Sequence, residues 1–281
     1  MNLFSIRDLC WTHGDGPPFF RHLSLDIPAG SIVSVHGDSG CGKTTLVQIL
    51  GMLWDRPVSP GQISLNIGEN SRDYASLSSA DRDAFRRDRF GFVLQNSYLI
   101  PHFSCSWNMA LPRFLAGLGF SQGHQESRSI LSGGELLPGP ESVLLEKLES
   151  SASKISQGQR QRFNILRALS NNPSIVFADE PTSNLDHESS LFFFDVLKRW
   201  QSCPDPKGDP RSLIVISHNL EHAYNSRFLD AQWFIIMRHP RRIRGADPTL
   251  PSHDVTVIPR SEVPSFEVFQ DLVRNRHGDH R

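Results

Sequence analysis

The 281-residue chain has little net charge, few cysteines and no long apolar run. Its formal charge of -1 offers no general attraction for a polyanion, so nucleic-acid binding would need a local basic patch. The run "RHPRRIR", from Arg238 to Arg244, is the one candidate, and such runs are more often solvated loops or strand ends. We therefore expect no nucleic-acid partner.

The cysteines argue against two kinds of small-domain architecture. They lie far apart and form no C-x-x-C pair, which disfavours both a structural zinc site and a disulfide scaffold. A reducing, cytosolic compartment fits this pattern. The four are Cys10, Cys41, Cys105 and Cys203.

The apolar runs have the length of strands. Examples are "SIVFA" from Ser174, "SLIVI" from Ser212 and "FIIM" from Phe234, whereas a membrane-spanning helix needs roughly 18 to 20 apolar residues. The N-terminus, "MNLFSIRDLC", lacks the apolar core of a secretory signal. We expect a soluble chain that reaches a membrane only through a partner.

Buried strands alternate with helical patterns along the chain. Three apolar, strand-like runs at residues 31–37, 174–180 and 212–218 are each separated by amphipathic stretches, which predicts a mostly parallel sheet covered on both faces. The early segments "FFRHLSLDIPAGS" and "GQISLNI" alternate like antiparallel strands at an edge. The predicted fold class is therefore α/β.

The middle and the end of the chain have a different pattern. Residues 97–169 are interpreted as a helical subdomain. Within it, "SWNMALPRFLAGLGF" predicts a helix and "VLLEKLESS" predicts a short helix. Between them, the stretch from Ser121 to Ser142 is rich in Gly, Ser and Pro and predicts a loop. Residues 1–245 form the predicted main domain. Residues 246–281 form an extension without assigned chemistry, with a possible helix from Phe266.

A phosphate-binding loop follows the first buried strand. The segment "GDSGCGKTT" fits the pattern G-x-x-x-x-G-K-[ST], and it lies between a predicted strand and a predicted helix, as that pattern requires. Its backbone N–H groups can surround phosphates, Lys43 is expected to reach the β and γ phosphates, and Thr44 is expected to ligate magnesium. The predicted nucleotide-binding residues here are Gly37, Asp38, Ser39, Gly40, Cys41, Gly42, Lys43, Thr44 and Thr45.

Polar residues close the other strands. Asp179 and Glu180 end the second strand, so both carboxylates lie at the carboxyl edge of the sheet and face opposite ways. Asp179 can then hold hydrated magnesium, while Glu180 can orient and deprotonate an attacking water. His218 ends the third strand and Gln95 ends "FGFVLQ"; each alone is more often a satisfied polar residue than a catalytic one.

With these motifs in this order, the chain resembles the nucleotide-binding subunits of ABC (ATP-binding cassette) transporters from about Asn2 to Ile243. The motifs are the phosphate loop, "FVLQNSYL", a signature, "IVFADEPTSNLD" and "VISH". The resemblance implies a P-loop NTPase (RecA-like) core with ATP and Mg²⁺ as cofactors. It also implies that Gln95 contacts the metal and the lytic water, that Ser183 to Asp186 form the D-loop, and that His218 is the switch histidine.

Two stretches compete to be the signature, which in this family opens a helix whose N-terminus points at a γ-phosphate held by the opposite subunit. "LSGGE" at Leu131 is followed by Pro138 and Pro140, which do not support a continuing helix. "ISQGQ" at Ile155 is followed by a proline-free stretch with apolar residues at helical spacing. We therefore predict "ISQGQ" as the signature and the earlier match as a surface loop.

The predicted signature departs from the family pattern L-S-G-G-Q at Ile155 and Gln157. Ser156 and Gly158 keep the hydroxyl and the close backbone approach that a phosphate contact needs, so we expect ATP to be sandwiched, with slower closure because of the Gln157 side chain.

The family also places an aromatic residue against adenine. Here His13 occupies the aligned position and Trp11 shares its strand face. Either of them stacks on the base, or Trp11 is ordinary packing.

The stretch Leu77 to Pro112 is similar to the subfamily that serves lipoprotein release and macrolide or peptide efflux. By that resemblance, the segment after Gln95 receives a helix of a membrane partner. The apolar candidates for this contact, each of which could equally be local packing, are Tyr98, Leu99, Ile100, Phe103 and Trp107.

The resemblance implies an ATPase subunit that dimerises around two MgATP molecules, as a homodimer or with a second cassette, and drives a transmembrane permease subunit. It would be cytoplasmic and peripheral on the inner membrane. One subunit would supply the P-loop and strand-end residues, and the other Ser156 and Gly158. Two alternatives remain. One is a soluble ABC ATPase, which is disfavoured because the chain has a single cassette, no heptad arm and no basic excess. The other is a nucleotide-sensing regulatory subunit with low turnover, which Gln157 suggests.

Overall fold

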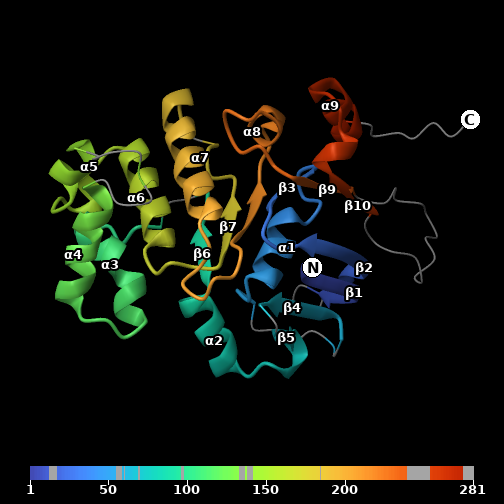
Figure 1. Cartoon of the computed structure of the whole chain (residues 1–281), viewed down its shortest axis with the longest axis horizontal. Coiled ribbons are helices and arrows are strands. Elements are labelled where there is room, and N and C mark those ends of the chain that lie inside the picture. The colour runs from blue at the N-terminus through green and yellow to red at the C-terminus, as the bar shows by residue number, and fades with distance from the viewer. Residues whose placement is uncertain are drawn as a thin grey trace, which may run out of the picture.

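The computed structural model describes residues 1–12, 18–54, 59, 61–68, 70–95, 98–132, 137, 142–183, 185–238 and 254–274 (Figure 1). Its strands form two sheets. The antiparallel sheet has the order β2-β1-β4-β5, with β1 Asn2–Thr12, β2 Pro18–Pro28, β4 Ile63–Ile67 and β5 Asn70–Asp73. The main sheet has the order β10-β9-β3-β8-β7-β6, with β3 Ile32–Gly37, β6 Phe90–Val93, β7 Ile175–Asp179, β8 Ser212–Ile216, β9 Trp233–Arg238 and β10 Asp254–Pro259.

The four pairings from β9 through to β6 run parallel, and only β10 joins antiparallel. The helices are α1 Lys43–Leu50, α2 Ser79–Asp88, α3 Cys105–Leu115, α4 Phe120–Leu131, α5 Ser142–Lys147, α6 Gln157–Leu169, α7 His187–Ser202, α8 Leu220–Tyr224 and α9 Phe266–Arg274, with single 3₁₀ turns at Tyr74–Ser76, Ala152–Lys154 and Arg260–Glu262. Figure 1 shows α3 to α6 gathered in a lobe at the side of the main sheet away from β1, β2, β4 and β5. The predicted α/β class, with a mostly parallel sheet, an antiparallel β edge and a helical subdomain, is confirmed.

Both faces of the main sheet are buried, which explains why its strands have almost continuous apolar sequences. In β7, Val176 and Ala178 belong to one apolar cluster with the helices α6 and α7, while Ile175 and Phe177 belong to a second cluster with α1 and the antiparallel sheet. The alternation follows from the opposite directions of successive side chains on a strand. It leaves the strand ends as the place for polar chemistry.

The loop predicted between Ser121 and Ser142 is wrong in its first half, because residues 120–131 form α4. Gly and Ser disfavour a helix locally, but tertiary packing outweighs that preference. A β-carbon on Gly123 would lie 3.1 Å from Cβ of Ala110 in α3, and Leu131 is fully buried. The small residues therefore allow α4 to pack closely on α3.

The C-terminal part of the chain completes the main sheet. β10 pairs with β9 from Asp254 opposite Arg238 to Pro259 opposite Trp233, and the predicted helix from Phe266 is present as α9. Phe269 of α9 is fully buried. The sequence analysis predicts no strand at β10, although Val255 to Ile258 are all β-branched, and residues 246–253 lie outside the described part. The domain boundary at residue 245 therefore stays a prediction.

In the described part of the chain, no helix combines the length and the apolar character required to cross a membrane.

Candidate functional site

The phosphate loop connects β3 to α1, as the sequence predicts. Its backbone uses positive φ angles of 77° at Gly40 and 93° at Gly42, which only glycine adopts without cost. Gly42 also has no room for a side chain, because a β-carbon there would lie 2.7 Å from the Phe19 ring. Since α1 begins at Lys43 without a side-chain cap, its first N–H groups face the loop. Loop and helix end together form an anion-binding cradle.

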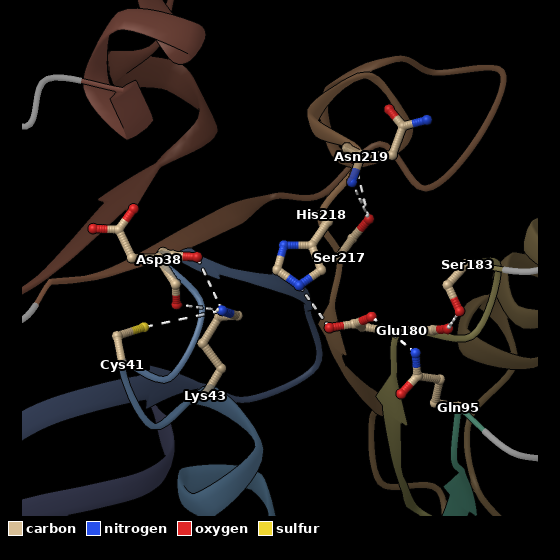
Figure 2. Close-up of polar contacts among 10 residues, drawn as sticks. Asp38, Cys41, Lys43, Gln95, Glu180, Ser183, Ser217, His218 and Asn219 are labelled. Carbon is tan, nitrogen blue, oxygen red and sulfur yellow. Dashed lines mark hydrogen bonds and ion pairs between the residues drawn. The ribbon is translucent and has the colours of Figure 1, made fainter.

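Lys43 is held inside this cradle. Its side chain is buried, and Nζ donates hydrogen bonds to the carbonyl oxygens of Gly37 at 2.9 Å and Asp38 at 2.8 Å (Figure 2). The Cys41 sulfur lies 4.0 Å from Nζ, and burial raises the pKa of its thiol. Cys41 is thus a buried, protonated residue that fills space beneath the loop, as the small size of its side chain predicts.

Asp179 lies at the end of β7 beside α1. The Thr44 hydroxyl donates a hydrogen bond to its carboxylate. Burial raises the pKa of Asp179, and the neighbouring Glu180 acts in the same direction, whereas Thr44 and Lys43 lower it. Two hard oxygen donors from different elements therefore meet at the carboxyl edge of the sheet, next to the phosphate loop.

Glu180 lies between two other strand-end residues. One carboxylate oxygen is 2.6 Å from Nε2 of His218, and the other accepts a hydrogen bond from Nε2 of Gln95 at 3.3 Å (Figure 2). The backbone of Glu180 has a φ of 45°, a left-handed conformation that costs a non-glycine residue roughly 1–3 kcal/mol and concentrates at functional sites. The sequence places these three residues at three strand ends, and the fold brings them together.

A cleft of about 330 Å³ joins the phosphate loop to these residues. It is lined by Phe19, Ser39, Gly40, Gly42, Lys43, Thr44, Thr45, Glu180 and His218. Phe19 is the one lining residue that the sequence analysis missed. Its sequence signal is its place in "PPFF"; its ring packs against that of the fully buried Phe20, with centroids 5.0 Å apart.

The two aromatic candidates for base stacking differ in what can be described. Trp11 is only 3% exposed, and its ring packs against Trp54 with centroids 5.3 Å apart. This burial favours the alternative of ordinary packing for Trp11. His13 lies outside the described residues.

The stretch "ISQGQ" opens a helix, as predicted. Ser156 is the N-cap of α6, where its hydroxyl accepts from the N–H of Gln159, and the Gln159 side chain accepts from the N–H of Ser156 in return. Ser156 and Gln157 are exposed, and Gly158 is half-buried. The helix N-terminus is thus presented at the surface.

The competing stretch "LSGGE" does not open a helix at Leu131. Leu131 is the last residue of α4 and Ser132 is its C-cap, so the leucine and serine of this stretch close a helix instead. Residues 133–136 lie outside the described part. A helix C-terminus carries carbonyl groups and the negative end of the dipole, which disfavour a phosphate.

The D-loop predicted at Ser183 to Asp186 follows directly on Glu180. Both the N–H and the hydroxyl of Ser183 donate to the Glu180 carbonyl, at 3.2 and 3.1 Å. Asp186 caps α7 by accepting from the Ser189 N–H at 2.7 Å. Asn184 lies outside the described residues.

Comparison with known proteins identifies relatives of this arrangement. The profile of the ABC transporter family matches residues 20–183. The macrolide export ATP-binding/permease protein MacB of Syntrophobacter fumaroxidans is 38% identical over 222 residues, which cover 78% of this chain and 29% of that protein. The lipoprotein-releasing system ATP-binding protein LolD of Wigglesworthia glossinidia brevipalpis is 37% identical over 203 residues, which cover 72% of this chain and 80% of that protein.

The chain spans 29 to 36% of the length of the three MacB relatives compared. Among solved structures, CbiO1 from Clostridium perfringens, part of the ABC transporter complex CbiONQ, superposes with a TM-score of 0.68 at 18% identity and covers 98% of this chain and 95% of that chain. This structural likeness shows a shared fold. Membership of the family is shown by the match to the family profile and by the sequence identity to LolD. The chain therefore belongs to the ABC transporter family, as the order of its motifs predicts.

Proposed function

We propose that the chain is an ATP-hydrolysing subunit that dimerises around two MgATP molecules and drives a transmembrane permease. The observation that carries this proposal is the position of Glu180. Its carboxylate lies in the same cleft as the phosphate loop and contacts both His218 and Gln95. A carboxylate held at the end of a phosphate cleft can orient and deprotonate a water aimed at a γ-phosphate.

The other residues of the cleft have distinct roles in this proposal. Lys43 reaches the β and γ phosphates, and the N–H groups of the loop and of the first turn of α1 hold the remaining phosphate oxygens. His218 would donate to Glu180 or to the γ-phosphate, because its imidazole contacts Glu180 and lines the cleft of the phosphate loop. Gln95 fixes the second oxygen of Glu180 and so sets the direction in which the carboxylate faces.

The donors beside the phosphate loop fit Mg²⁺. The Thr44 hydroxyl and the Asp179 carboxylate already meet through a hydrogen bond, and both are hard oxygen ligands. Among the described residues no group of three His, Cys, Asp or Glu side chains could hold a metal, which suits an ion bound by few protein ligands together with phosphates and water. When bound, Mg²⁺ neutralises charge on the phosphate oxygens. Asp179 and Thr44 would hold it.

Dimerisation is proposed because the phosphate cleft and the signature lie on different parts of one chain. Figure 1 shows α6, which Ser156 caps, separated from α1 by the strands β6 and β7. The exposed N-terminus of α6 offers the Ser156 hydroxyl and helical N–H groups to an anion on another molecule. A second copy, or a second cassette, would then complete each site.

A groove on the helical lobe supports the proposal of a membrane partner. It has a volume of about 640 Å³ and lies between α2, β6, α3 and α6. Its apolar lining includes Leu53, Phe90, Phe92, Leu111, Pro112 and Leu115. Leu115 is 62% exposed, and an exposed apolar groove of this kind fits a helix of a protein partner.

The candidates after Gln95 divide by exposure. Tyr98, Phe103 and Trp107 are 63%, 40% and 41% exposed, so they stay candidates for contact with the partner. Leu99 is buried at 7% exposure and fits local packing instead. Ile100 is half-buried.

The names of the relatives support an association with a membrane permease. Their names describe an ATP-binding/permease protein and the ATP-binding protein of a lipoprotein-releasing system. We propose that this chain likewise works at the inner face of the membrane against a permease.

The test is ATP hydrolysis by wild type beside Glu180→Gln, with size-exclusion chromatography in MgATP. We expect wild type to hydrolyse ATP, and Glu180→Gln to bind ATP, lose hydrolysis and accumulate as a dimer. The matched control is Glu262→Gln, which changes an exposed carboxylate far along the chain and should retain wild-type activity. Full activity in Glu180→Gln would contradict the catalytic role. Binding without hydrolysis in wild type would favour the nucleotide-sensing alternative.

A further inference from the structure

A second connection joins the loops that carry Glu180 and His218. The short helix α8 begins two residues after His218, and Asn219 caps it by accepting from the N–H groups of Glu221 and His222 at 3.0 and 3.3 Å. The position of His222 is therefore fixed relative to the loop that carries His218. His222 has no role in the motifs that the sequence analysis uses.

The His222 ring reaches the chain that leaves Glu180. Its Nδ1 lies 3.3 Å from the hydroxyl oxygen of Thr182, two residues after Glu180. The ring is also enclosed by aromatic side chains, with its centroid 4.5 Å from that of Phe228 and 5.2 Å from that of Phe194. A half-buried, aromatic enclosure limits the freedom of the imidazole and makes the contact with Thr182 directional.

The segment around Thr182 is itself tied to Glu180. Ser183 donates twice to the Glu180 carbonyl, and the N–H of Leu185 donates to the Thr182 carbonyl at 3.2 Å. Beyond the end of the strand pairing, where the Glu180 N–H donates to the Ile216 carbonyl at 3.0 Å, side chains of the two loops meet in two further places. One is the contact between Glu180 and His218 at 2.6 Å, and the other is the contact between Thr182 and His222 at 3.3 Å.

We propose that His222 is a positioning residue, which acts through Thr182 to keep the loop of Glu180 in register with the loop of His218. The inference rests on the ATP hydrolysis proposed above. Glu180 and His218 lie just beyond the paired ends of β7 and β8, and the His218 side chain is 54% exposed, so the direct contact between the two side chains is open to solvent. The contact between Thr182 and His222 is half-buried and adds a second side-chain connection between the two loops.

The chemistry of His222 suits this role. Burial lowers its pKa, so the ring is neutral at neutral pH and one nitrogen can pair with a hydroxyl group in either tautomer. The titratable side chains that face it are Glu221 on its own helix, which raises the pKa, and His187 at the start of α7, which lowers it. Thr182 supplies the hydroxyl, and Phe194 and Phe228 supply the apolar walls.

Two substitutions at this position separate hydrogen bonding from packing. Asn carries an oxygen at the same number of bonds from Cα as Nδ1 of His, so His222→Asn keeps an acceptor for Thr182 but loses apolar volume. His222→Leu keeps apolar volume but loses the acceptor. If His222 acts only as packing, the Leu variant should resemble wild type more closely; if it acts through Thr182, the Asn variant should.

The experiment measures steady-state ATP hydrolysis of purified full-length chains. We expect kcat of His222→Leu to fall about tenfold, the equivalent of about one hydrogen bond, with KM for ATP changed less than about twofold because the nucleotide contacts remain. His222→Asn should keep most of the wild-type kcat. Thr182→Val approaches the same contact from the other side and should match His222→Leu. The double variant should show no further loss, since both changes remove one interaction.

His102→Leu serves as the control, because His102 is exposed in the helical lobe and should leave kcat unchanged. Thermal unfolding of each variant identifies any that fails to fold. If a His222 variant fails to fold, the kcat of Thr182→Val alone tests the contact between Thr182 and His222. A Leu variant that keeps the wild-type kcat, or an Asn variant that is worse than the Leu variant, would overturn the role of His222 while leaving ATP hydrolysis intact. Wild type without turnover would overturn both.

Discussion

A buried histidine next to the phosphate loop makes the stability of this protein depend on pH. His36 is the penultimate residue of β3, directly before Gly37, and its side chain is only 1% exposed. Its Nε2 lies 2.8 Å from the Ser34 hydroxyl, and its ring packs edge-on against Phe269 of α9 at 5.2 Å and 83°. The C-terminal helix and the P-loop strand thus enclose an ionisable group between them.

The magnitude follows from the shift in pKa. Burial lowers the pKa of His36 from 6.5 to about 3, and electrostatic interactions with Lys43 and His218 act in the same direction. Above pH 6.5 neither the folded nor the unfolded state holds the proton. Between pH 6.5 and 3 only the unfolded state takes it up, so stability is lost as the pH falls. The linkage relation gives a loss of about 2 kcal/mol between pH 7 and pH 5 from this one group.

The assay compares wild type with His36→Leu by urea unfolding at pH 7, 6 and 5. The Leu variant lacks the titrating group, so contributions of the other ionisable groups cancel in the difference between the two proteins. We expect wild type to lose about 2 kcal/mol more than the variant between pH 7 and pH 5. The exposed His102 gives a control, since His102→Leu should follow the wild-type curve. Equal losses in wild type and His36→Leu would refute the reasoning.

Four further substitutions, at three positions, test the elements around the site. Ser156→Ala should lower the free energy of unfolding of the protein by about 1 kcal/mol, because it removes the N-cap of α6. Ser156→Asp keeps the N-cap but repels the partner's γ-phosphate. The Asp variant should therefore be the more stable of the two in chemical unfolding, and the Ala variant should dimerise better with ATP. Gly42→Ala, at a φ of 93° and 2.7 Å from the Phe19 ring, should weaken MgATP binding at least about tenfold by calorimetry, and unchanged affinity would contradict the cradle. Asp205 is fully buried against Arg89 at 3.0 Å, so Asp205→Ala should cost about 3 kcal/mol in urea unfolding, and a loss below about 1 kcal/mol would refute that role.

The strand-end residues could be predicted because each carries a local signal. A glycine-rich loop between a strand and a helix, or a carboxylate pair after a buried strand, is visible within about ten residues. The choice between the two signature stretches also rests on a local signal. Prolines after Leu131 oppose a helix there, whereas the stretch that follows Ser156 has no proline and allows one. The structure has α6 beginning at Gln157, as that reasoning requires.

Other features depend on distant contacts and could not be predicted. α4 packs closely on α3 where Gly123 meets Ala110, a contact between two helices that the periodicity of either one does not reveal. β10 forms through pairing with β9 across residues 239–253, where no short turn gives a hairpin signal. The contact between Thr182 and His222 joins residues 40 positions apart, each of which alone is an ordinary polar residue.

The strand order explains how the separate signals become one site. β8 lies between β3 and β7 in the main sheet, although it comes after both in the sequence. His218, which follows β8, must therefore lie between the phosphate loop after β3 and Glu180 after β7, as Figure 2 shows for His218 between Lys43 and Glu180. Parallel strands place all three ends at the same edge. A histidine in this position lines the cleft beside the phosphate loop and contacts the Glu180 carboxylate, which we propose as the catalytic base, so a movement of the loop after β8 would change both arrangements at once.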